Sequence, residues 1–148
     1  MVGMTTIPHD RAWTRDDLAA LPDDGNRYEI LDGTLLVTPS PTPYHQLALL
    51  SLYDQLKRSC PRELSIAVAP LDIVLDETTV LQPDLLVVRR DRITRAALIG
   101  VPDLVVEMLS PGTRRVDQTS KLNRYARAGI PAYWIADPDA LTLSLIHI

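Results

Sequence analysis

The stretch LVVEML at residues 104–109 constrains the fold more than any other, because it places a carboxylate inside an apolar run. A short apolar run rich in valine is typical of a strand buried on both faces. A Ser-Pro-Gly break follows at 110–112, then a helical pattern over 117–128 and a second strand pattern over 132–136. This order predicts an α/β or α+β fold in which a mixed β-sheet is flanked by helices.

The rest of the chain supplies further elements around that strand. Asp32-Gly33 between two apolar segments indicates an N-terminal β-hairpin. Residues 1–13 are expected to form a flexible arm and residues 14–148 a single domain. The other expected elements are a short helix capped by Thr14, hairpin strands at 27–31 and 34–38, a helix at 44–58, a strand at 64–75 broken near Pro70, and strands at 80–88 and 141–148.

The end of the sequence and its composition set limits on the protein. The last strand stops without a closing element and would leave an exposed sheet edge, so we expect the native chain to be longer or its final residues not to be native. A net charge of -4 argues against a strongly basic, non-specific nucleic-acid binder, although it allows a local basic patch. With one cysteine, no signal-peptide pattern and no apolar run of membrane-spanning length, the sequence predicts a cytoplasmic protein outside the membrane.

Glu107 is the first candidate site residue, because an acid within a buried strand is costly unless something binds it. Strand alternation places Asp103 on the same face, but about 13 Å away, which is too far to share a metal ion. The second acid must therefore come from another strand. Asp84, just before LLVV, is the best candidate, since two antiparallel neighbours would bring the carboxylates together. Two hard oxygen donors with open positions suit Mg²⁺ or Mn²⁺.

Lys121 is the third candidate, since it lies at the edge of the apolar stripe of its helix and can reach over the sheet towards Glu107. A cation near a metal site can orient a water nucleophile and stabilise charge developing on a phosphate. The competing interpretation is an ordinary helix ion pair with Asp117, worth a few tenths of a kcal/mol.

Other structural interpretations stay open at this point. Glu107 can pair with an arginine, and Asp84 can serve only in a turn. Glu29 can be an exposed hairpin acid, and His45 can be a packing residue in the first turn of its helix. Six arginines are interpreted either as a solvated surface or as a rim that contacts phosphates; they are Arg89, Arg90, Arg92, Arg95, Arg114 and Arg115.

Several segments together resemble the Uma-two family, a branch of the PD-(D/E)XK restriction-endonuclease-like superfamily. They are YEILDGTLL, PSPTPYH, LQPDLLVV, PDLVVEMLSPGT, the D-x-x-x-K-x-x-x-Y pattern from residue 117, and AYWIADP. The resemblance implies a restriction-endonuclease-like core with metal ligands at Asp84 and Glu107 and a catalytic lysine at Lys121. It also implies that Glu29 and His45 occupy family positions near the same site.

The chain departs from the superfamily pattern at Leu109, where the usual lysine two residues after the glutamate would stand. In the Uma-two arrangement the helix supplies the lysine instead. The resemblance implies a Mg²⁺- or Mn²⁺-dependent endonuclease that hydrolyses phosphodiester bonds, with DNA favoured over RNA and a homodimer left open. The alternatives are a non-catalytic module that binds nucleic acid or protein and, more weakly supported, a metal-dependent hydrolase of another substrate.

Overall fold

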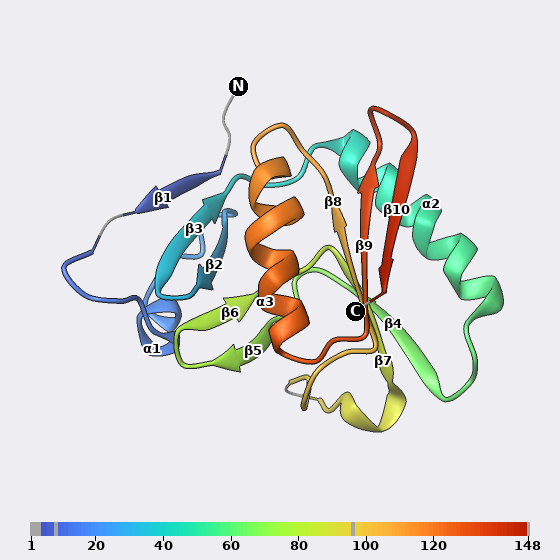
Figure 1. Ribbon diagram of the computed structural model, residues 1–148, viewed down its shortest axis with the longest axis horizontal. Coiled ribbons are helices and arrows are strands. Elements are labelled where there is room, and N and C mark those ends of the chain that lie inside the picture. Colours follow the sequence, from blue (N-terminus) through green and yellow to red (C-terminus); the bar gives the residue numbers. More distant parts are fainter. Residues whose placement is uncertain (1–3, 8, 96, 148) are drawn as a thin grey trace.

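The computed structural model describes residues 4–7, 9–95 and 97–147, which form two five-stranded sheets (Figure 1). The expected arm falls partly outside the described residues, at 1–3 and 8, as does residue 148 of the expected last strand. Within that arm, Thr5–Ile7 form β1, which pairs with β3. The other elements in chain order are α1 (Arg15–Ala19), β2 (Arg27–Leu31), β3 (Thr34–Thr38), α2 (Pro43–Ser59), β4 (Leu64–Val68), β5 (Ile73–Asp76), β6 (Thr79–Leu81), β7 (Leu85–Arg89), the 3-10 helix η1 (Arg90–Arg92), β8 (Leu104–Met108), the π-helix η2 (Val116–Lys121), α3 (Leu122–Arg127), β9 (Ala132–Asp137) and β10 (Thr142–His147).

The central sheet has the strand order β10-β9-β8-β7-β4, so the LVVEML strand lies in its middle as the sequence predicts. β8 and β9 are parallel and are joined by the crossover through η2 and α3. The remaining neighbours in this sheet are antiparallel. The second sheet, called here the N-terminal sheet, has the order β1-β3-β2-β6-β5. The α/β class and the mixed sheet flanked by helices are therefore confirmed.

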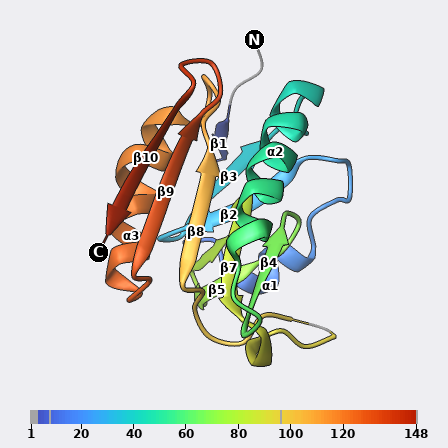
Figure 2. The ribbon, with the colours of Figure 1, turned by 90° about the vertical axis from the view of Figure 1, so that its right-hand side faces the viewer.

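The two faces of the central sheet pack against different partners, and Figure 2 shows α2 and α3 on opposite sides of it. Val106 belongs to the cluster that packs under α2. Its neighbour Val105 belongs to the larger cluster, which joins Tyr125 of α3 to residues of the N-terminal sheet. Because strand residues alternate, Glu107 shares the face of Val105. The acid therefore points into the space between the central sheet, α3 and the N-terminal sheet.

Two predicted strands are each divided between the sheets, so their predicted extent is wrong. Residues 64–75 form β4 in the central sheet and β5 in the N-terminal sheet, and residues 80–88 are divided between β6 and β7. Proline lies at both crossings, Pro70 and Pro83. Because proline lacks a backbone N–H, it suits the points at which the chain leaves one ladder and enters another.

The helix predicted over 117–128 is also different in form, because it begins as the π-helix η2 and continues as α3. Tyr133 of β9 donates a hydrogen bond from its hydroxyl to the Asp117 carbonyl at 2.8 Å. The wider turns of a π-helix, such as η2, occur frequently at functional sites.

Among the residues described, no helix is long and apolar enough to cross a membrane. The cytoplasmic location stays a prediction.

Candidate active site

Asp84 and Glu107 meet because β7 and β8 pair antiparallel. Leu85 is the register partner of Val106, so one further step places Asp84 opposite Glu107. The peptide N–H of Met108 donates to Asp84 Oδ2 at 2.7 Å, which fixes the Asp84 carboxylate beside the end of β8. Both acids are buried, each 2% exposed. The two strands therefore have the antiparallel pairing on which the meeting of the two acids depends.

Arg27 and His45 flank Asp84. Arg27 of β2 donates from Nη2 to Asp84 Oδ1 at 2.8 Å, and His45 Nε2 in the first turn of α2 lies 3.6 Å from Asp84 Oδ2. Burial alone would raise the pKa of Asp84, but His45, the charge of Arg27 and the Met108 N–H outweigh it and lower the pKa to about 2. Asp84 is therefore ionised at neutral pH and available as a hard ligand.

Lys121 lies at the end of η2 and binds three carboxylates at once. Its Nζ lies 3.0 Å from each Glu29 oxygen, 3.1 Å from Glu107 Oε1 and 3.4 Å from Asp117 Oδ1. Burial lowers the pKa of Lys121, but the three carboxylates reverse this and raise it well above its ordinary value. The side chain therefore carries a positive charge in the site and cannot act as a base at neutral pH. The ion pair with Asp117 is present, but it is one part of this larger cluster.

Glu29 reaches the cluster from the N-terminal sheet. It is 1% exposed, so the interpretation as an exposed hairpin acid is wrong. Besides binding Lys121, its Oε1 accepts the backbone N–H of Gln82 at 2.7 Å, just after β6. The Tyr125 hydroxyl of α3 donates to Glu107 Oε1 at 3.2 Å from the other side. Glu29 thus joins the two sheets through Lys121.

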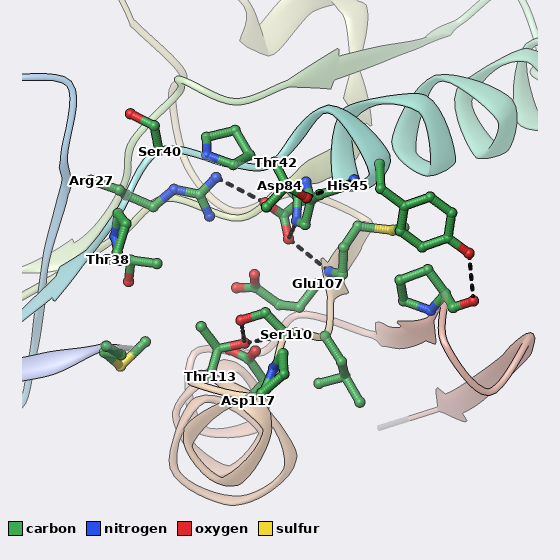
Figure 3. Close-up of a pocket in the computed structure, with 18 of the residues that line it drawn as sticks. Arg27, Thr38, Ser40, Thr42, His45, Asp84, Glu107, Ser110, Thr113 and Asp117 are labelled. Carbon is green, nitrogen blue, oxygen red and sulfur yellow. Dashed lines mark hydrogen bonds and ion pairs between the residues drawn. The ribbon is translucent and has the colours of Figure 1, made fainter. Parts of the chain in front are cut away.

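All five candidates from the sequence line one cavity of about 200 Å³. They are Glu29, His45, Asp84, Glu107 and Lys121. Figure 3 labels His45, Asp84 and Glu107 at this cavity. Among the other residues that line the cavity, Arg27, Thr38 and Asp117 bear on its chemistry and were not assigned to the site from the sequence. Arg27 and Glu29 are two residues apart on one strand and so share a face, which was the available signal for Arg27. Asp117 and Lys121 are four residues apart on the predicted helix, but this spacing is equally typical of a surface ion pair.

Several buried polar atoms at this cavity have no hydrogen-bond partner within the described ranges. They are Thr38 Oγ1 and His45 Nδ1, and Asp117 Oδ1 has the ion pair with Lys121 at 3.4 Å in place of a hydrogen bond. Buried polar groups are normally hydrogen-bonded, so an accumulation of unpartnered ones indicates that the cavity takes up a polar ligand or water. The arginine-rich segment after β7 lies at the far end of that strand from Asp84, and none of its residues lines the cavity.

The charges around the cavity do not balance. Five carboxylates line it, four of them buried and one, Asp139, exposed. The four buried ones share the cavity with Arg27 and Lys121, which leaves an excess of two negative charges among these groups when all of them are ionised and His45 is neutral. The buried carboxylates are Glu29, Asp84, Glu107 and Asp117. Burial raises the pKa of Glu107 well above its usual range and also raises that of Asp117, while Lys121 opposes both shifts. A bound cation of charge two would remove the imbalance.

The carboxylate oxygens at this cavity fit a hard divalent cation that is held by two protein ligands rather than by a complete cage of them. Within the described part of the chain, no three His, Cys, Asp or Glu side chains are gathered into a preformed metal cage. Mg²⁺, however, is usually held by one or two carboxylates, with water and substrate phosphate completing its octahedron. Asp84 and Glu107, opposite one another at the cavity wall, are suited to that role.

Comparison with known proteins decides the family. A family model described as "Uma2: Putative restriction endonuclease" matches residues 15–147. The chain belongs to the Uma2 family. This confirms the resemblance to the Uma-two family and supports nuclease chemistry in general. Proteins of the restriction-endonuclease-like type generally use divalent metal ions.

The Uma2 chain also resembles a solved structure. The crystal structure titled as a "putative nuclease belonging to DUF820", from Anabaena variabilis ATCC 29413, superposes with a TM-score of 0.76 at 21% sequence identity. The match covers 90% of this chain and 79% of that chain. At this identity the likeness shows the fold. No curated protein matches the chain significantly.

Proposed function

We propose that this Uma2 protein is a metal-dependent endonuclease that hydrolyses phosphodiester bonds in DNA. One observation carries the proposal: the buried acids Asp84 and Glu107 face each other across β7 and β8, with Lys121 Nζ 3.1 Å from Glu107, at the wall of a polar cavity. The excess of negative charge in that cavity supports a divalent cation, Mg²⁺ or Mn²⁺, between the two acids. When bound, such a cation polarises a phosphate and lowers the pKa of a nearby water.

Three side chains of this protein would have separate roles in the reaction. Lys121 keeps its proton and provides a fixed positive charge that stabilises the extra negative charge of the phosphate during water attack. Glu29 holds the ammonium group in place with both of its oxygens. His45 presents Nδ1 without a partner among the described residues, so this nitrogen is the candidate acceptor for the proton of the attacking water.

Plasmid cleavage tests the proposal. Supercoiled plasmid is incubated with wild type, Asp84→Asn and Glu107→Gln in Mg²⁺ or Mn²⁺, with a chelator control. Asp103→Asn is the matched control, since Asp103 lies just before β8 and does not line the cavity. We expect cleavage by the wild type and the control, and a loss of roughly 100-fold or more in the two site variants.

The outcome also separates the alternatives. Equal cleavage by all four proteins would refute the assignment of the acids. A wild type that retards DNA in a gel but leaves it intact in both metals would instead favour the non-catalytic binding module. Labelled RNA of the same sequence tests the preference for DNA, and light scattering tests whether the protein forms the homodimer that the sequence left open.

A further inference from the structure

Arg27 is a cavity residue whose hydrogen-bonding capacity is mostly unused. It lies two residues before Glu29 on β2, so both side chains project from the same face of the N-terminal sheet. Its side chain is 16% exposed, and Nη2 donates to Asp84 Oδ1 at 2.8 Å. A guanidinium has five N–H donors, and this one makes no second hydrogen bond with the described part of the chain.

Thr38 adds a second donor beside the guanidinium. It is the cross-strand register partner of Arg27, so the two side chains emerge next to each other from β2 and β3. Thr38 also lines the cavity, and its Oγ1 is buried with no hydrogen-bond partner in the described residues. Figure 3 shows Arg27 extending towards Asp84 with Thr38 near its base and Glu107 reaching into the same space.

The cavity lining also carries groups that favour an anion, and they lie next to the acids. Arg27 and His45, in the first turn of α2, both lie against Asp84. Thr38 lies beside Arg27, and the N-terminal end of α2 is the positive end of the helix dipole. A planar guanidinium with free N–H groups matches two oxygens of a phosphate, whereas a single contact with Asp84 uses little of that geometry.

We propose that Arg27, together with the Thr38 hydroxyl, is the binding site for the non-bridging phosphate oxygens of the substrate. This inference rests on the proposed phosphodiesterase function and assigns the phosphate to the Arg27 side of the cavity, next to Asp84. Arg27 then contacts both Asp84 and the phosphate and aligns one with the other. A purely structural Arg27 would serve only to hold Asp84, and the two roles predict different measurements.

The test combines three readouts on Arg27→Gln, Arg27→Lys and wild type. They are KM and kcat for cleavage of a fluorogenic DNA hairpin in Mg²⁺, the Kd of the same DNA in Ca²⁺ by fluorescence anisotropy, and the Kd of Mn²⁺ by electron paramagnetic resonance. Arg58→Gln is the matched control, since Arg58 lies on the exposed side of α2 and pairs only with Asp54 among the residues described.

We expect Arg27→Gln to raise KM and the DNA Kd at least about tenfold, the size expected for a lost charged hydrogen bond. Its Mn²⁺ affinity should be unchanged or tighter, because a cation beside Asp84 has been removed. Arg27→Lys retains the charge without the fork and should give an intermediate KM with normal Mn²⁺ affinity, which decides the matter if Arg27→Gln does not fold. Thr38→Val should raise KM by a smaller factor.

Other outcomes would overturn the inference. Unchanged KM and DNA Kd in Arg27→Gln would show that Arg27 does not bind phosphate. Weakened Mn²⁺ binding in parallel with the rise in KM would show that it acts only by holding Asp84. If the wild type binds DNA without cutting it, a tenfold weaker Kd in Arg27→Gln supports the phosphate site while the endonuclease proposal fails. If the wild type does not bind DNA, both fail.

Discussion

Replacing Lys121 by methionine should destabilise the fold strongly and in a pH-dependent way. The ammonium group lies within 3.4 Å of Glu29, Glu107 and Asp117, all of which are buried. Removing one partner of a buried ion pair typically costs about 3–5 kcal/mol, because the remaining charge is left uncompensated. We expect a loss of this size in the free energy of unfolding at pH 7.5.

The pH dependence follows from the carboxylates. Burial raises the pKa of Glu107 and of Asp117 even though the charge of Lys121 opposes it. Removing that charge raises both pKa values further. The folded variant then binds more protons than the unfolded chain, whose acids ionise near pH 4, so its stability falls as the pH rises above that value. The loss at pH 5 should therefore be smaller than the loss at pH 7.5, by about 1 kcal/mol or more.

Urea unfolding followed by tryptophan fluorescence at both pH values measures these losses. Lys57→Met is the matched control, because Lys57 is the other lysine of the chain and lies exposed in the last turn of α2. Its effect should stay within about 0.5 kcal/mol. A Lys121→Met loss below about 1 kcal/mol at pH 7.5, or a loss equal at the two pH values, would refute the reasoning.

Two further predictions concern acid stability and the hairpin. Asp84 has a folded pKa of about 2, below that of an unfolded aspartate, so its stabilisation is present above about pH 4 and is lost as the pH falls towards 2. Asp84→Asn should therefore flatten the fall in urea midpoint between pH 5 and pH 2.5, and a variant as acid-sensitive as wild type would contradict this. Gly33→Ala should lower stability by about 1–2 kcal/mol, because its φ is +80° and the new Cβ would lie 2.8 Å from the Cβ of Ala12. Gly100→Ala, at φ +77° with no atom within 4 Å, should lose less, and equal melting temperatures for the two would show that the contact is unimportant.

Local sequence patterns were sufficient to predict the N-terminal hairpin and the position of Glu107 within a buried strand. Asp32 and Gly33 both adopt positive φ, as the type I′ two-residue hairpin turn requires, and the strands on either side have the predicted bounds. The rise of a strand also predicts that Asp103 lies about 13 Å from Glu107, too far to share a metal ion with it. Each of these inferences depends on a few neighbouring residues, and such short-range rules transfer well from sequence to structure.

Contacts between residues that are far apart in the chain could not be predicted from such local patterns. Glu29 and Lys121 are 92 residues apart and meet only because the N-terminal sheet packs against η2. A glutamate in a hairpin is equally consistent with a solvent-facing position, so burial and the partner were both undetermined. The division of 64–75 and 80–88 between two sheets has the same origin, since a proline break indicates where a strand ends but not which sheet the next one joins.

The central claim is that Asp84 and Glu107 share one divalent cation. Anomalous scattering from crystals grown with Mn²⁺ tests it most directly, because it locates the ion without reference to activity. We predict one strong peak within about 2.0–2.6 Å of an oxygen from each carboxylate, and its loss in Glu107→Gln. Crystals in which both carboxylates are clearly ordered and no Mn²⁺ peak lies between them would contradict the account.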